Sequence, residues 1–147
     1  MSGPGDAFRP AYTAGLALCL GLPALAALLL LTGAIPAGDQ PPEGLVQQVG
    51  YQLTGLVFLA AAIVFSRRTR AFARLAALPP ADRPAAARRE CLVVGAILQV
   101  GVCCGLAYWA MVGTHAPRHT WGFLLTTPML YVALVPRPAR WAKASEG

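Results

Sequence analysis

The sequence of residues 11–36 is AYTAGLALCLGLPALAALLLLTGAIP, and no Asp, Glu, Lys or Arg interrupts this stretch. A helix needs about 20 mostly apolar residues to cross the hydrocarbon core of a bilayer. Lipid offers no partner to a backbone N–H or C=O, so a continuous apolar run of this length favours a helix, which satisfies its own backbone. The stretch therefore predicts a membrane-spanning helix over about residues 12–35.

Three further runs without charged residues follow, and they predict spans over about residues 45–66, 91–113 and 119–136. The last run is short and contains Pro128, so its length alone is marginal. Barrel strands would alternate apolar and polar residues, which these runs do not. We expect residues 1–147 to form a single integral membrane domain, an all-α bundle of four transmembrane helices.

The composition supports lipid as the solvent. Hydrophobic residues make up 56% of the chain and charged residues 12%, whereas soluble domains carry about a quarter charged residues. A chain of this size cannot bury so much apolar surface in its own core. A cleaved signal peptide ending near Ile35-Pro36-Ala37 is the alternative for the first run, but its apolar part is about twice the usual length, which favours a retained helix.

The distribution of basic residues predicts the orientation. Of the 12 Lys and Arg residues, only Arg118 lies between the first and second or the third and fourth runs; the other eleven lie in the two tails and in residues 67–90. The positive-inside rule places the basic side in the cytoplasm, so both termini are expected inside a multi-pass protein of the plasma or inner membrane. The net charge of +6 then indicates an anionic membrane surface as partner, not nucleic acid.

The basic segment between the second and third runs predicts a helical hairpin tip. Residues 66–78 favour an extension of the second helix, Pro79-Pro80 end it, and Asp82 is expected to cap a new helix with Pro84 in its first turn. Six arginines of this tip are candidates for contact with anionic lipid or another anion: Arg67, Arg68, Arg70, Arg74, Arg88 and Arg89. The alternative is that they only fix the orientation during insertion.

Three glutamines within the runs are candidates for binding a polar ligand: Gln48, Gln52 and Gln99. Gln48, Gln52 and Gly55 share one helix face because they are spaced i, i+4, i+7. Contact between helices is the favoured interpretation, since an amide in lipid gains by bonding to a neighbouring helix. Gly101 and Gly105 form a GxxxG spacing that predicts close helix packing, either within the chain or in a dimer.

Six aromatic residues near the ends of the runs are typical of interfacial belts, although the outer ones could instead line a shallow pocket: Tyr12, Tyr51, Tyr108, Trp109, Trp121 and Trp141. We expect no metal and no cofactor. Cys103 and Cys104 are adjacent, so on a helix their sulfurs point about 100° apart. His115 and His119 are separated by Pro117 in a short loop, and no acid lies near them in the sequence.

No ionisable residue lies in the middle of a predicted span, which argues against proton-driven transport and intramembrane aspartyl chemistry. The favoured function is a non-catalytic subunit or accessory factor of a larger membrane assembly, bound to other membrane subunits or to itself. A small oligomeric transporter or channel for a neutral or lipophilic solute is the alternative. A membrane enzyme that holds an anionic or lipid substrate with its arginines is the third hypothesis, and an enzymatic role is not favoured.

Overall fold

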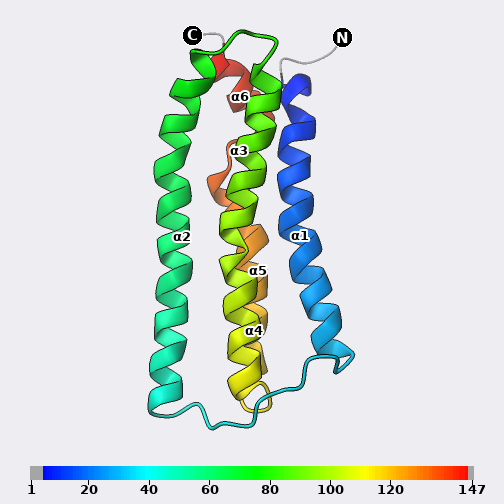
Figure 1. Cartoon of the computed structure of the whole chain (residues 1–147), viewed down its shortest axis with the longest axis vertical. Helices are drawn as coiled ribbons and strands as arrows, with labels where there is room; N and C mark the ends of the chain where they lie inside the picture. Colours follow the sequence, from blue (N-terminus) through cyan, green and yellow to red (C-terminus); the bar gives the residue numbers. More distant parts are fainter. Residues whose placement is uncertain (1–4, 146–147) are drawn as a thin grey trace.

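The computed structural model describes residues 5–145, and this part of the chain is helical without strands. A single 3-10 turn, η1, precedes the first helix, and α6 follows the last long one (Figure 1). The elements in chain order are η1 (Asp6–Phe8), α1 (Arg9–Leu31), α2 (Leu45–Ala76), α3 (Arg83–Leu98), α4 (Val100–Val112), α5 (Pro117–Leu134) and α6 (Pro138–Ser145).

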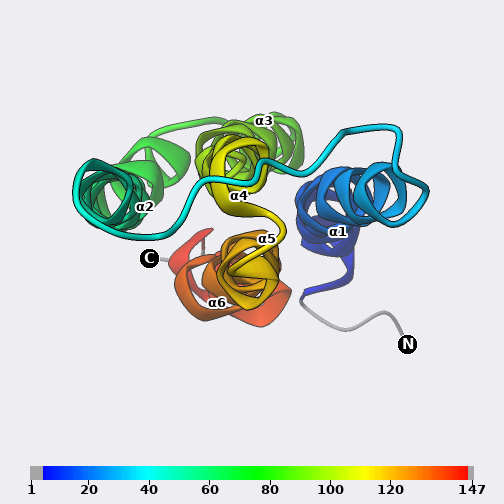
Figure 2. The same cartoon turned by 90° about the horizontal axis from the view of Figure 1, so that it is seen from below.

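The long helices run side by side as an elongated bundle. Helices α3 and α4 continue one another and lie between α1 and α2, while α5 packs along α4 and α1 (Figure 2). One end of the bundle, here called the basic end, holds the start of α1, the end of α2, the start of α3 and all of α6 (Figure 1). The other end, the distal end, holds the α1–α2 and α4–α5 loops.

Three helical segments of the described chain are long and apolar enough to cross a membrane: Asp6–Leu31, Leu45–Ala76 and Arg83–Val112. Helix α5, which contains most of the predicted fourth span, is not among them. Its first turn holds Arg118 and His119, and Pro128 lies in its interior, so its composition is more polar than that of the other three. Length and composition thus support three spans, with α5 as a further helix of the bundle.

Two helices end a few residues before the predicted spans do, and backbone geometry explains both ends. Helix α1 ends at Leu31 instead of residue 35, because Gly33 takes a positive φ of 71° and its N–H bonds to the Leu30 carbonyl. Helix α5 ends at Leu134, because Val135 is extended before Pro136.

The predicted hairpin tip is confirmed in its main features. Helix α2 continues to Ala76, and Asp82 occupies the N-cap position of α3. The Asp82 side chain, however, makes no capping hydrogen bond. The tip is closed instead by Arg83, whose Nε donates to the Leu78 carbonyl over 2.9 Å and whose guanidinium also reaches the Ala76 carbonyl at 3.4 Å. The end of α2 therefore gains hydrogen-bond donors from the start of α3.

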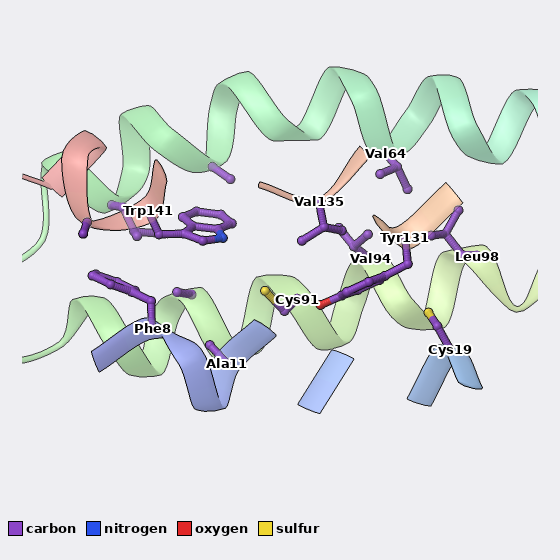
Figure 3. Packing of buried hydrophobic residues seen from close by; sticks show 14 residues of the cluster. Phe8, Ala11, Cys19, Val64, Cys91, Val94, Leu98, Tyr131, Val135 and Trp141 are labelled. Carbon is purple, nitrogen blue, oxygen red and sulfur yellow. The ribbon is translucent and has the colours of Figure 1, made fainter. Parts of the chain in front are cut away.

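The main apolar cluster lies toward the basic end and joins every helix except α4. Figure 3 shows Phe8 and Trp141 at one end of this cluster, and the Tyr131 ring pointing toward Cys91. The Tyr131 hydroxyl donates to the Tyr12 carbonyl over 3.0 Å, which ties α5 to α1. Trp141 is only 2% exposed and packs on the Phe72 ring, with centroids 5.0 Å apart. Trp141, which the sequence placed in an interfacial belt, is thus turned by α6 into the core and does not present its indole on the surface.

The loop after α1 closes the distal end. Its backbone N–H groups at Gly38 and Gln40 donate to the carbonyls of Trp109 and Met111, each over 3.0 Å. These carbonyls belong to the last turn of α4, where helical donors run out; the Trp109 carbonyl also accepts from the Gly113 N–H over 2.9 Å. A side chain at Gly38 would collide with the backbone at Met111, so only glycine permits this approach.

Candidate functional site

One face of α2 is polar and points away from the bundle. Gln48, Gln52 and Leu59 are exposed, and a Cβ placed on Gly55 would meet nothing within 4 Å. These four residues, here called the Gln face, lie opposite the buried side of α2, which is formed by Val57, Ala60 and Val64.

Gln99 belongs to a different place in the fold, the junction between α3 and α4. Its Nε2 donates to the carbonyls of Gly95 at 3.2 Å and Leu18 at 3.3 Å, and its Oε1 is buried without a partner among the described residues. The structure thus does not bring Gln99 together with Gln48 and Gln52.

A cleft of about 290 Å³ opens between α2, α4 and α5 near the distal end. Tyr51 and Tyr108, two of the aromatic residues near the ends of the runs, line it. Tyr108 is buried and its ring lies 5.8 Å from the His119 ring. The amide in this cleft is that of Gln47 and not of Gln48. Sequence reasoning missed Gln47, although positions 47, 50, 51 and 54 share one helix face and all four line the cleft.

The six candidate arginines of the hairpin tip do not form one patch. Arg67, Arg74 and Arg89 line a cleft of about 470 Å³ between α2 and α3, together with Glu90. Arg67 pairs with Glu90 through two hydrogen bonds of 3.0 Å each. These bonds raise the pKa of Arg67 above its ordinary value, because they favour the charged guanidinium.

The other three candidates lie elsewhere. Arg68 lines a separate cleft of about 510 Å³ between α2, α5 and α6, with Arg137 and Arg140. Arg70 and Arg88 are exposed and line neither cleft. Arg137 and Arg140 were not among the sequence candidates, because their proximity to Arg68 depends on the fold of α6.

The GxxxG pair is in contact with α5 of the same chain. A Cβ on Gly101 would come within 2.6 Å of Thr127 Oγ1, and one on Gly105 within 3.3 Å of the Thr120 carbonyl. Thr127 is fully buried, and its hydroxyl donates to the Leu98 carbonyl over 3.1 Å at the α3–α4 junction. The two glycines therefore serve packing within the chain.

The cysteines and histidines are dispersed. Within the part of the chain that the structure describes, no three His, Cys, Asp or Glu residues gather as metal ligands. Cys103 faces a groove beside α1, whereas Cys104 is buried with its sulfur 3.6 Å from the Leu53 carbonyl of α2. An acid does lie near His115, since its Nε2 is 3.2 Å from Asp39 Oδ1 of the α1–α2 loop.

Three surfaces thus carry the polar chemistry of the described chain: the Gln face of α2, the distal cleft and the arginine clefts of the basic end. No protein-family model matches the chain, and comparisons with curated proteins and with solved structures likewise find no match.

Proposed function

We propose that this chain is a multi-pass protein of the cell membrane that serves as a non-catalytic subunit of a larger membrane assembly. In this proposal it crosses the membrane four times, with its basic end in the cytoplasm, and it holds a helix of another membrane subunit on the Gln face of α2.

The fourth span of this proposal is α5. Its 18 residues measure about 27 Å at 1.5 Å per residue, close to the roughly 30 Å of hydrocarbon. Arg118 and His119 in its first turn would lie at the headgroups. The interior Thr126 and Thr127 hydroxyls bond to the Gly122 and Leu98 carbonyls, so neither remains unsatisfied in lipid.

Reporter fusions test this topology. Fusions at residues 39, 80, 117 and the C-terminus should report outside, inside, outside and inside, in that order. A C-terminal fusion that reports outside would exclude the four-span arrangement.

The observation that carries the subunit role is the exposure of Gln52 on an apolar helix. Gln52 lies seven residues into α2, about 10 Å from its start. In the proposed topology this depth places its amide beyond the headgroups, in the hydrocarbon. Facing lipid, its amide would lack hydrogen-bond partners, and no helix of the described chain supplies them. A partner helix on the Gln face would supply them, and Gly55 would let that helix approach closely.

Photo-crosslinking in the native membrane tests the subunit role. A photoreactive residue at position 59, on the Gln face and 57% exposed, leaves both amides in place. It should yield a defined crosslinked product, whose mass distinguishes a second copy of this chain from a different subunit. The control position is Leu28, which is 56% exposed on α1 and should crosslink only to lipid. Equal products at both positions, or none at position 59, would contradict the proposal.

A second candidate function, transport of a neutral or lipophilic solute, is favoured by the groove between α1 and α4. This groove of about 210 Å³ is lined by apolar residues that include Leu22, Leu25 and Leu106, and Gln99 is a polar residue of its lining. The unpartnered Gln99 Oε1 would accept a hydrogen bond from a hydroxyl-bearing solute if the groove opened by a side-chain movement. Tighter binding of a long-chain alcohol to the wild type than to Gln99→Leu would support this function, and equal binding would contradict it.

A further inference from the structure

The cleft between α2, α5 and α6 is lined by three arginines at the basic end. Arg68 comes from α2, Arg137 precedes α6 and Arg140 lies in its first turn. No carboxylate of the described residues lines this cleft of about 510 Å³. Three like charges around one cavity repel each other, so an anion in the cavity stabilises the arrangement.

The position of α6 fixes two of these arginines. Pro136 and Pro138 restrict the backbone on both sides of Arg137. The buried Trp141, whose ring packs on that of Phe72 at an angle of 58°, then anchors α6 against α2. The backbone at Arg137 and Arg140 is therefore placed at the cleft without a ligand, although both side chains are exposed, and this lowers part of the ordering cost of binding one.

In the neighbouring cleft between α2 and α3, a carboxylate already pairs with one of the arginines. There Glu90 accepts two hydrogen bonds from Arg67, so a carboxylate of the chain offsets part of the positive charge. Arg68 is the next residue on the same helix, and an adjoining apolar pocket is lined by both Arg68 and Glu90. Glu90 pairs with Arg67, however, and does not line the cleft of Arg68, Arg137 and Arg140. An anion bound in that cleft would come from outside the described residues.

The remaining lining indicates the chemistry of this anion. Guanidinium groups bind phosphate oxygens through paired hydrogen bonds, and the first turn of α6, which reaches the cleft at Ala139, adds its positive helix end. Val132 and Ala133 of α5 supply an exposed apolar wall. A ligand with a phosphate beside an apolar chain satisfies both parts of the lining.

We propose that this cleft binds the phosphate group of an anionic phospholipid of the cytoplasmic leaflet, with an acyl chain along α5. The inference requires the basic end to lie at the cytoplasmic headgroups, and it is independent of the partner helix on α2.

The test compares two variants with equal loss of charge at the same end. Arg68→Gln/Arg137→Gln/Arg140→Gln removes the cleft arginines, and the control Arg9→Gln/Arg70→Gln/Arg88→Gln removes three exposed arginines that do not line it. Purified proteins are titrated with phosphatidylglycerol and with phosphatidylcholine in mild detergent, and bound lipid is counted by native mass spectrometry. The cleft variant should lose phosphatidylglycerol affinity by on the order of tenfold or more, and the control by much less.

Competition with inorganic phosphate distinguishes a phospholipid headgroup from free phosphate as the ligand of the cleft. Displacement of phosphatidylglycerol only at high phosphate concentration supports the lipid as ligand, because the apolar wall adds affinity that phosphate lacks. Tight binding of inorganic phosphate to the wild type, without preference for phosphatidylglycerol over phosphatidylcholine, would overturn the lipid assignment. Equal phosphatidylglycerol affinity in the cleft variant and the control would overturn the site itself. If the triple variant fails to fold, the exposed single changes Arg140→Gln and Arg88→Gln provide the same comparison.

Discussion

Helix α2 and the α3–α4 segment are both apolar enough to cross a membrane, but they differ in burial. Of the apolar 18-residue stretch of each, only 17% is buried in the bundle for α2, compared with 50% for α3–α4. The position of small residues explains the difference. Gly95, Gly101 and Gly105 of α3–α4 face α1 or α5 at close range, whereas Gly55 of α2 faces outward. The other α2 glycine, Gly50, would place a Cβ 3.1 Å from the Tyr108 ring of α4. The bundle of α1, α3, α4 and α5 is thus built for internal packing, and α2 keeps the face that carries Gly55 free.

The largest expected effect is a loss of stability when a glycine of the packed unit is enlarged. In Gly15→Leu, the new Cβ would lie 2.7 Å from Tyr131 Cζ and 2.8 Å from the Cys91 carbonyl oxygen. The carbonyl belongs to a helix backbone and cannot move aside, so we expect a loss of about 3 kcal/mol in thermal unfolding in detergent.

The matched control for this change is Gly21→Leu on the same helix, where a Cβ meets nothing within 4 Å. Its unfolding temperature should stay near that of the wild type, or rise because leucine is the better helix former. Equal losses in both variants would show that the cost comes from α1 itself and not from its packing on α5.

A smaller effect is expected at the α3–α4 junction. Thr127→Val keeps the size of the side chain but removes the hydroxyl that bonds to the Leu98 carbonyl. A buried carbonyl without its donor should cost about 1.5 kcal/mol, measured by thermal or chemical unfolding in detergent. Thr126→Val is the control, because its hydroxyl bonds to the Gly122 carbonyl of its own helix. Equal effects would mean that Thr127 does not join α5 to α3.

The attachment of α2 at the basic end should be weaker still. Glu90→Gln removes the charge that Arg67 binds, and since the Arg67 side chain is 34% exposed, water replaces part of the interaction. We expect a loss of about 0.5–1 kcal/mol that shrinks as salt is added. Asp82→Asn removes a charge at the same end without breaking a capping hydrogen bond and should change little. A loss in Glu90→Gln that salt does not reduce would argue against an ionic contribution.

The Arg67 pKa also sets a pH expectation for this pair. A base whose pKa is raised in the folded state stabilises the protein below its unfolded pKa, and this contribution is lost only as pH rises through the raised value. Arginine titrates far above neutrality, so between pH 6 and 9 the pair should not weaken through Arg67. Unfolding temperatures of the wild type and Glu90→Gln across this range should therefore differ by a constant amount.

Much of the fold could be predicted because apolar runs and proline positions act locally. The four runs, the extension of α2 and the start of α3 after Pro79-Pro80 follow from such signals. The end of α1 just before Gly33 could also have been predicted from that glycine, but the apolar run continues to Pro36 and favoured a longer helix. Helix α6 was missed because its stability comes from Trp141 packing on Phe72, a contact between residues distant in the chain.

The candidate sites were harder to predict, because each depends on which helix faces meet. The spacing of Gln48, Gln52 and Gly55 defined a shared face, but it did not indicate whether that face points inward or outward. The division of the arginines likewise depends on α6, which brings Arg137 and Arg140 to the cleft of Arg68, whereas Arg70 and Arg88 do not line it. The sequence shows at which end of the bundle the arginines lie. It does not show which of them line the same cleft, because they are far apart in the chain.

The smallest expected effect on stability tests the role of the Gln face most sharply. Gln48→Leu/Gln52→Leu replaces two exposed amides that make no side-chain hydrogen bond within the described chain, so the purified protein should unfold within about 0.5 kcal/mol of the wild type. If a partner helix uses these amides, its recovery with the variant should fall severalfold, since such interhelical bonds contribute about 0.6–2 kcal/mol in membranes. Gln47→Leu is the control, because its side chain lines the distal cleft and lies within 3.4 Å of the Tyr51 hydroxyl. Undiminished recovery of the partner with Gln48→Leu/Gln52→Leu would mean that lipid tolerates both amides, and α2 would then be an ordinary lipid-facing helix.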